Sequence, residues 1–175
     1  MDTDKNSAGP HLNLRLLCVA LALLLSACAG VTPRSTESQT ERPPVSARQE
    51  AQAQDVVMYA LSLMDTGYRF GGKNPAAGLD CSGMVSYVFA QAVGLKLNGS
   101  AADIARRGHA VPLSQLRPGD LVFFNTLNKP YSHVGIYIGG DRFAHAPSSG
   151  GKVRLDSLKQ GWYASRLEEA RAYFD

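Results

Sequence analysis

The sequence has few charged residues, few cysteines and no long apolar run, and each shortage argues against a class of protein. Charged residues make up 19% of the 175 positions, the net charge is +3, and Lys and Arg never cluster. This composition differs from that of a disordered chain, and it lacks the basic patch of a nucleic-acid-binding protein. A chain of this length is predicted to form one modest domain with accessory segments.

The apolar run nearest the N-terminus, Leu16–Leu25, predicts a secretory signal peptide. It has ten residues, whereas a helix that stays in a membrane needs about 20, and it lies between Arg15 and a short stretch of small residues. A short buried helix is the alternative, which the lack of an amphipathic pattern disfavours. Residues 1–27 are therefore predicted to be removed from the mature protein.

Residues 25–28, Leu-Ser-Ala-Cys, resemble the lipobox of bacterial lipoproteins. The resemblance implies cleavage before Cys28 and attachment of lipid to that cysteine. Several acyl chains, palmitate among them, would anchor the protein durably in a membrane. Because Ala29 rather than aspartate follows Cys28, the common sorting scheme of two-membrane bacteria implies an outer-membrane lipoprotein that faces the periplasm.

The composition changes twice along the rest of the chain. Residues 29–50 are rich in Ser, Thr, Pro, Gln and Glu and hold almost no large apolar side chain. Such a segment cannot bury a core, so residues 28–50 are predicted to be the lipidated cysteine and a flexible tether. Aromatic and aliphatic residues return from Ala51 onward, and residues 51–175 are predicted to form one globular domain.

The cysteine count singles out one thiol. Cys18 would leave with the signal peptide and Cys28 would carry lipid, so Cys81 would remain without a disulfide partner in an oxidising compartment. A free cysteine is often a small buried hydrophobe, and it is sometimes a catalytic nucleophile. The count alone leaves both interpretations open.

The residues around Cys81 favour the catalytic interpretation. Apolar residues recur at helical spacing from Val85 to Ala92, which predicts a helix with one apolar face. Asp80 is a plausible N-cap, so Cys81 is expected in the first turn. Unpaired backbone N–H groups and the helix dipole there favour thiolate over thiol.

Two histidines are predicted to share one face of a hairpin. Apolar residues alternate after His133, turn residues occupy 139–141, and a second strand leads to His145. A three-residue loop would place His145 opposite Gly135, which puts the two histidines on one face, roughly 7–8 Å apart, with the glycine leaving room between them. A two-residue loop would separate them onto opposite faces. His109 lies among polar residues and is predicted to be solvated.

Other uses of these residues are less well supported by the sequence. A zinc site built from Cys81, His133 and His145 would lack an evident fourth ligand and the usual short ligand spacing. Residues 71–73, Gly-Gly-Lys, lack the spacing of a phosphate-binding loop and predict a tight loop instead. Asp120 follows Pro-Gly and precedes an apolar run, so a turn role is favoured over a catalytic carboxylate.

Five segments of the chain resemble, in order, the NlpC family of bacterial cell-wall cysteine peptidases. They are Gly67–Gly72, Gly78–Gly83, Leu116–Phe124, His133–Gly139 and Phe143–Ala146. The resemblance implies an α+β, papain-like fold in which helices pack on an antiparallel β-sheet. It also implies that no metal or organic cofactor is needed.

The resemblance carries roles onto individual residues. It implies that Cys81 is the nucleophile, His133 the general base, His145 the residue that orients this base, and Tyr68 an oxyanion donor. It implies that three further residues bind substrate: Asp80, Ser82 and Ser100.

The function implied is that of a peptidoglycan hydrolase, an endopeptidase that cleaves amide bonds in stem peptides or their cross-links. The expected partners are peptidoglycan stem peptides and a membrane, reached through lipid on Cys28, with no nucleic acid. Two alternatives remain open: a non-catalytic peptidoglycan-binding lipoprotein, and an amidase or acyltransferase that uses the same three residues.

Overall fold

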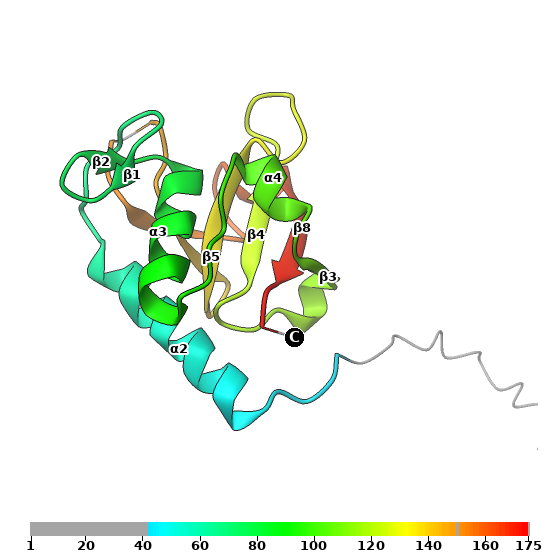
Figure 1. Ribbon diagram of the computed structural model, residues 1–175. Helices are drawn as coiled ribbons and strands as arrows, with labels where there is room; N and C mark the ends of the chain where they lie inside the picture. The colour runs from blue at the N-terminus through cyan, green and yellow to red at the C-terminus, as the bar shows by residue number, and fades with distance from the viewer. Residues whose placement is uncertain (1–41, 150, 175) are drawn as a thin grey trace, which may run out of the picture. The chain divides into compact units, whose positions relative to one another are not determined.

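The computed structural model describes residues 42–149 and 151–174. Figure 1 shows these residues as a ribbon of helices and strands. The predicted signal peptide, Cys28 and most of the predicted tether lie outside the described residues. None of the helices within the described segments is long and apolar enough to cross a membrane.

Three α-helices begin at polar caps. Helix α2 (Ala47–Ser62) opens with a capping box, in which the Ser46 hydroxyl accepts from the Gln49 backbone N–H and the Gln49 side chain accepts from that of Ser46. Helix α3 (Cys81–Val93) and the short helix α4 (Ala101–Ala105) follow. Each cap satisfies backbone N–H groups that a helix start would otherwise leave without partners.

Six strands form one antiparallel sheet in the order β3-β8-β4-β5-β6-β7. The strands are β3 (His109–Val111), β4 (Leu121–Phe124), β5 (His133–Gly139), β6 (Arg142–His145), β7 (Arg154–Ser157) and β8 (Leu167–Ala172). Two short strands, β1 (Lys73–Asn74) and β2 (Gly78–Leu79), pair separately. Two 3₁₀ turns complete the elements: Leu113–Gln115 and Ala164–Arg166.

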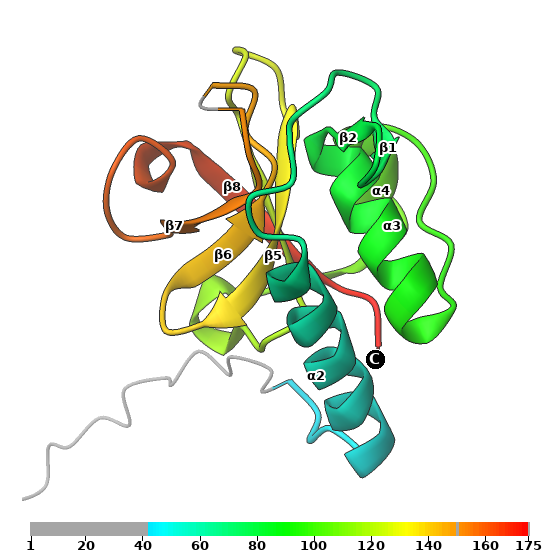
Figure 2. The ribbon, with the colours of Figure 1, turned by 90° about the vertical axis from the view of Figure 1, so that its left-hand side faces the viewer.

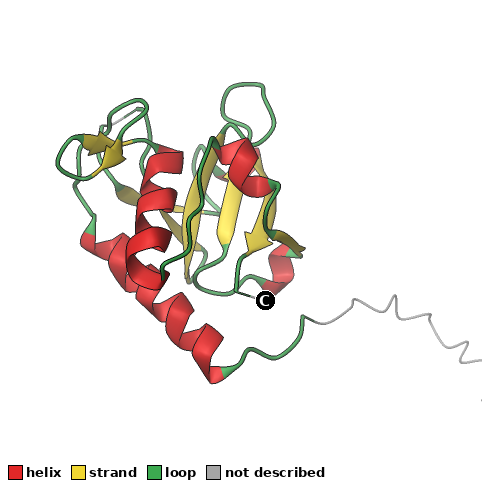
Figure 3. Cartoon of the chain, in the orientation of Figure 1, coloured by secondary structure: helices red, strands yellow, loops and turns green. Residues whose placement is uncertain are grey.

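The helices cover one face of the sheet. Helix α3 packs on β5 and β6, and α2 packs on α3 and β5. Figure 2 shows this face from the side, and Figure 3 separates helices from strands by colour. The α+β architecture predicted from the sequence, with helices on an antiparallel sheet, is therefore confirmed.

Buried side chains line both faces of the sheet. Along β4, Leu121 and Phe123 join the core beneath the helices, while Val122 and Phe124 join a second buried cluster on the opposite face. Successive side chains of a strand point to opposite faces, so a strand buried on both sides reads as one apolar run. The second cluster includes Tyr163 and packs against the two histidines of the hairpin.

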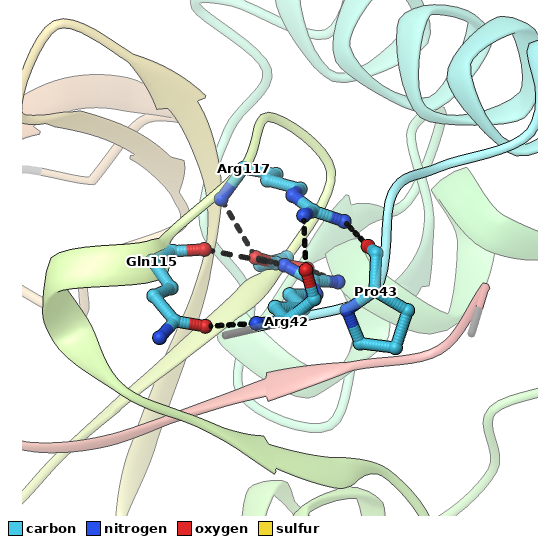
Figure 4. A network of polar contacts seen from close by, with 5 residues as sticks. Arg42, Pro43, Gln115 and Arg117 are labelled. Atoms are coloured by element: carbon cyan, nitrogen blue, oxygen red, sulfur yellow. Dashed lines mark hydrogen bonds and ion pairs between the residues drawn. The ribbon is translucent and has the colours of Figure 1, made fainter. Parts of the chain in front are cut away.

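The folded domain begins before residue 51. Arg42 forms a two-pronged ion pair with Asp120, with Nη1–Oδ2 2.7 Å and Nη2–Oδ1 3.0 Å, and both side chains are buried. Arg117 donates to the backbone carbonyls of Arg42 and Pro43 at 3.2 and 2.9 Å, as Figure 4 shows. We call these contacts of Arg42 and Pro43 the N-terminal clamp.

The clamp and helix α2 correct the predicted end of the tether. Residues 42–50 hold almost no large apolar side chain, and from this composition they were predicted to belong to the flexible tether. They are nevertheless part of the domain, because a capping box and a buried ion pair fix them. Asp120 stabilises the turn before β4, as predicted, because its Oδ2 accepts a hydrogen bond from the Arg117 backbone N–H at 2.8 Å.

Candidate active site

Cys81 is the first residue of helix α3, as the sequence predicts. The Asp80 carboxylate caps the helix: its Oδ1 accepts from the Gly83 N–H at 2.6 Å and from the Ser82 hydroxyl at 3.0 Å. Its Oδ2 accepts from the Gly71 N–H at 2.9 Å. One carboxylate therefore fastens both the helix start and the loop before it, which fixes where the Cys81 thiol lies.

The loop before α3 lies directly on the first turn of the helix. A Cβ atom on Gly83 would fall 1.9 Å from the Gly72 carbonyl oxygen, a distance that no side chain tolerates. Residues 71–73 thus form a tight loop, as predicted, with Gly71 at a φ of 69°. Tyr68, which lies just before this loop, lines the same cleft as Cys81.

The Cys81 thiol is neutral at neutral pH in the free protein. Burial raises the pKa of Cys81 to about 11, and the Asp80 charge adds to this, although the backbone N–H groups of Val134, Ser82 and Cys81 itself lower it. The expected effect of the helix start is therefore present, but burial outweighs it.

His133 and His145 are in direct contact. His133 begins β5, His145 ends β6, and Nε2 of His133 lies 2.7 Å from Nδ1 of His145. Both side chains are buried, and the rings meet edge to face with centroids 5.0 Å apart. The predicted shared face is confirmed.

The hairpin reaches this register by a route that the sequence did not indicate. Gly139 pairs with Arg142, so the loop has two residues, not three, and a bulge between Tyr137 and Gly139 supplies the extra residue. Ile136 then pairs with Ala144, which places Gly135 opposite His145 as predicted.

The histidine pair continues to a third polar group that sequence reasoning missed. His145 Nε2 lies 2.9 Å from Asp156 Oδ2, and the same oxygen accepts from Arg154 Nε at 3.1 Å and Nη2 at 3.0 Å. Both residues come from β7. Their i, i+2 spacing places them on one face of a strand, but no local signal pairs that strand with β6.

Both histidines are neutral at neutral pH. Burial lowers the pKa of His133 to about 3, with further lowering by the charges of His145 and Arg154. Burial lowers the pKa of His145 to about 4, and the bond to Asp156 and its charge only partly oppose this. A neutral imidazole has one nitrogen lone pair that can accept a proton.

A cleft of about 350 Å³ collects most of the predicted site residues. Cys81 and His133 line it, while His145 lies behind His133 in the sheet. The predicted oxyanion donor and the three predicted substrate-binding residues also line it: Tyr68, Asp80, Ser82 and Ser100. The Ser82 and Ser100 hydroxyls already bond Asp80 and Asp103, respectively.

The cleft also contains two apolar residues that sequence reasoning missed. Phe70 is 90% exposed and Leu127 is 74% exposed, and both line the cleft with Cys81. Exposed apolar side chains beside a nucleophile offer a contact surface for the aliphatic parts of a substrate. His109 lies on β3 and is exposed, as predicted.

Among residues 42–149 and 151–174, no three His, Cys, Asp or Glu side chains are arranged to hold a metal ion. The fold and the site define a papain-like cysteine-hydrolase class, in which a cysteine begins a helix and histidines project from the adjoining sheet. Residues 65–172 match the model of the NlpC/P60 family. The chain belongs to that family.

Relatives of known name agree with this assignment. The chain is 34% identical over 168 residues to the murein DD-endopeptidase MepS/murein LD-carboxypeptidase of Escherichia coli (strain K12), with 87% of this chain and 88% of that protein covered. It is 40% identical over 119 residues to the gamma-DL-glutamyl hydrolase of Bacillus subtilis (strain 168), which covers 67% of this chain. The chain spans only 29% of that hydrolase.

The solved structures that resemble the chain include the NlpC/p60 domain of the peptidoglycan hydrolase SagA. The TM-score is 0.61 at 33% identity, and the match covers 69% of this chain and 98% of that one. An NLP/P60-family protein of Staphylococcus aureus that is described as similar to lipoprotein matches with a TM-score of 0.63 at 27% identity. That match covers 75% of this chain and 43% of the other.

Proposed function

We propose that this chain is a peptidoglycan endopeptidase in which Cys81 is the nucleophile and His133 the general base. The observation that supports this most directly is the shared cleft of Cys81 and His133, with His145 hydrogen-bonded behind the base. This arrangement meets the requirement of an activated nucleophile, namely a thiol, a base and a group that orients the base.

The reaction begins from a neutral thiol and a neutral imidazole. His133 accepts the Cys81 proton as the sulfur attacks the scissile carbonyl carbon, which creates a tetrahedral oxyanion and an imidazolium. In this proposal the Cys81 backbone N–H and the hydroxyl of Tyr68, which lines the same cleft, donate to that oxyanion. Burial raises the pKa of Tyr68, and the charges of Cys81 and Asp80 raise it further. The hydroxyl therefore stays protonated and can donate a hydrogen bond.

His133 then returns the proton to the leaving amine, and the C–N bond breaks to leave an acyl-enzyme. A water molecule gives a proton to His133 and attacks the thioester. The C–S bond breaks, His133 passes that proton to the departing sulfur, and the carboxylic acid product leaves with the Cys81 thiol and neutral His133 restored. Water is the only co-reactant that the cycle consumes.

The peptide cross-link of peptidoglycan is the bond that we propose as substrate. The supporting relative is MepS, named a murein DD-endopeptidase, because it matches this chain over 88% of its own length. The relatives named for glutamyl bonds match over smaller parts: the chain spans 46% of the gamma-D-glutamyl-L-lysine dipeptidyl-peptidase of Bacillus subtilis (strain 168).

We also propose that Cys28 carries lipid and holds the domain at the outer membrane, facing the periplasm. Residues 25–28 support the anchor. Asp120 immediately precedes the end of β4 at which Leu121 pairs with Ile136, whereas His133 pairs with Phe124 at the other end. Arg42, which pairs with Asp120, therefore lies at the end of the sheet opposite His133.

The test is digestion of purified diaminopimelate-type peptidoglycan by the unlipidated chain beginning at Ala29. Fragments are identified by mass spectrometry, with Cys81→Ser as the inactive control. Conversion of cross-linked muropeptides into uncross-linked ones whose stems remain on the sugar, by the wild type alone, supports the proposal. Inert wild-type protein on both intact sacculi and isolated cross-linked muropeptides would overturn it and favour a binding protein. Cleavage between sugar and peptide would favour an amidase.

A further inference from the structure

Behind the two histidines lies a carboxylate that the mechanism above does not use. Asp156 Oδ2 accepts three hydrogen bonds, one from His145 Nε2 and two from the Arg154 guanidinium. The sheet register explains the arrangement: Arg154 lies opposite His145, and Asp156 lies opposite Phe143. Asp156 is thus the diagonal neighbour of His145 on the face that carries both histidines.

We propose that Asp156, held by Arg154, is a positioning residue that fixes the tautomers of both histidines and so leaves Nδ1 of His133 as the basic nitrogen. This inference rests on the proposed function, because it assigns the atom of His133 that takes the Cys81 proton. Asp156 does not line the cleft that holds Cys81, and it acts through His145.

The tautomers follow from counting protons along the chain of bonds. An ionised carboxylate only accepts hydrogen bonds, so His145 Nε2 must carry the proton in its bond to Asp156. Neutral His145 then has its lone pair on Nδ1, which must accept from Nε2–H of His133. Neutral His133 therefore has its only lone pair on Nδ1, which makes this atom the base.

Arg154 has two effects on this arrangement. Its Nε and Nη2 both donate to Asp156 Oδ2, which orients the carboxylate oxygen toward His145. Its charge also opposes protonation of the histidines, whereas the charge of Asp156 favours protonation of His145. The Arg154–Asp156 pair thus gives His145 a fixed hydrogen-bond acceptor. It does so without making His145 basic enough to retain the proton that His133 takes from Cys81.

Two further titratable groups lie near the pair, Tyr163 and Cys81. The Tyr163 ring packs on both histidines, with centroids 5.3 Å from His133 and 4.6 Å from His145. Burial raises the pKa of Tyr163 to about 12, so this residue stays neutral. From helix α3, Cys81 lines the cleft on the side of His133.

The test compares Asp156→Ala with Asp156→Asn in the unlipidated chain. Two quantities are measured: the histidine tautomers, by ¹⁵N NMR at neutral pH, and the kcat and KM of muropeptide cleavage. The Asn side chain keeps an acceptor oxygen, which the Arg154 donors hold in place, whereas Ala removes the acceptor. Asp141→Asn is the matched control, because Asp141 pairs with Lys159 at 2.8 Å on the exposed hairpin turn.

We expect both histidines of the wild type, of Asp156→Asn and of Asp141→Asn to carry the proton on Nε2. In Asp156→Ala we expect mixed tautomers and a kcat lower by about 10- to 100-fold at unchanged KM. The size follows from the roughly 10²- to 10⁴-fold contribution of general-base catalysis, of which a part is lost. Asp156→Asn should recover most of the loss.

An Asp156→Ala protein that keeps both Nε2–H tautomers and the wild-type kcat would overturn the inference. Mixed tautomers in the wild type would do the same. Circular dichroism and thermal unfolding of each variant separate a tautomer change from loss of the fold. If the wild type cleaves no peptidoglycan, the proposed function fails, and the tautomer measurement still decides the role of Asp156.

Discussion

The Cβ atom that Gly135 lacks would fall 3.2 Å from the Cβ of His145 and 2.5 Å from Cδ2 of Phe143. The absence of a side chain at this position lets the imidazole of His145 approach His133. Gly135 lies opposite His145 in the hairpin, so no other residue type leaves this space without moving the partner strand.

Gly135→Ala is therefore expected to lower both stability and activity. An added methyl group in a packed core costs about 1–3 kcal/mol, and here the Phe143 ring must move, with the backbone of the strand that carries His145 pressed beside it. We expect kcat to fall by more than about tenfold, because misplacement of a catalytic group by about 1 Å costs up to about 10²-fold. Urea unfolding and steady-state kinetics measure the two effects.

Gly67→Ala is the matched control for this prediction. A Cβ atom on Gly67 meets no atom within 4 Å, and its backbone does not require glycine. Equal losses in the two variants would show that the space at Gly135 has no special role.

The ionisation of Cys81 is testable by alkylation. The chain beginning at Ala29 has no other cysteine, so uptake of iodoacetamide reports on this thiol alone. Because burial raises its pKa to about 11, the rate should stay low between pH 5 and 8 and rise steeply above about pH 9. A fast plateau below neutral pH would instead indicate a resting thiolate paired with a charged His133. Addition of urea should move the apparent pKa down toward about 8.5, the ordinary value.

The positions of Asp80 and Cys81 were predictable from the sequence because they depend only on residues nearby in the chain. Asp80 caps the helix that Cys81 begins, and both lie within one turn. The shared face of His133 and His145 was predicted for a three-residue loop, because side chains alternate between the two faces of a strand. The bulge that produces this register was not predictable, since residues 137–139 carry no signal that separates a bulge from a longer loop.

The residues that were missed depend on contacts between distant parts of the chain. Asp156 matters because β7 pairs with β6 in one register, which the alternation within each strand does not set. Arg42 matters because its guanidinium meets Asp120, 78 residues away. Polar contacts of this kind leave no periodic pattern, so a reading based on apolar spacing does not detect them.

The buried histidines are expected to make the fold sensitive to acid. Their pKa values are about 3 and 4 in the folded protein, against about 6.5 in the unfolded chain. Below pH 6.5 the two histidines bind protons in the unfolded chain but not in the folded protein. They therefore lower the free energy of unfolding progressively from about pH 6.5 toward pH 3. Their effect is absent above pH 6.5.

Thermal unfolding between pH 4 and 8 checks this expectation. The wild-type Tm should fall as the pH is lowered through this range, and a double variant with His133→Ala and His145→Ala should show a shallower fall. Because the double variant loses buried volume, its Tm is compared by slope against pH and not by absolute value. Parallel slopes in the two proteins would contradict the assignment of the acid sensitivity to these histidines.

The N-terminal clamp is expected to stabilise the domain without taking part in catalysis. Asp120→Ala leaves the buried guanidinium of Arg42 without its carboxylate, and loss of one partner of a buried pair costs about 3–5 kcal/mol. A chain that begins at Ala51 loses this pair together with the Ser46 cap and the first residues of α2. We therefore expect urea midpoints to fall in both proteins, and more in the shortened chain than in Asp120→Ala.

Activity separates this role from a catalytic one. Asp120 precedes the end of β4 opposite His133, so both altered proteins should keep the wild-type kcat and KM at temperatures where they are folded. Lys152→Ala, which removes an exposed pair with Asp65 at 4.0 Å, is the matched control and should leave the free energy of unfolding within about 0.5 kcal/mol of wild type. A shortened chain as stable as the wild type would return residues 42–50 to the tether, whereas a kcat that falls in the folded Asp120→Ala protein would reopen Asp120 as a catalytic carboxylate.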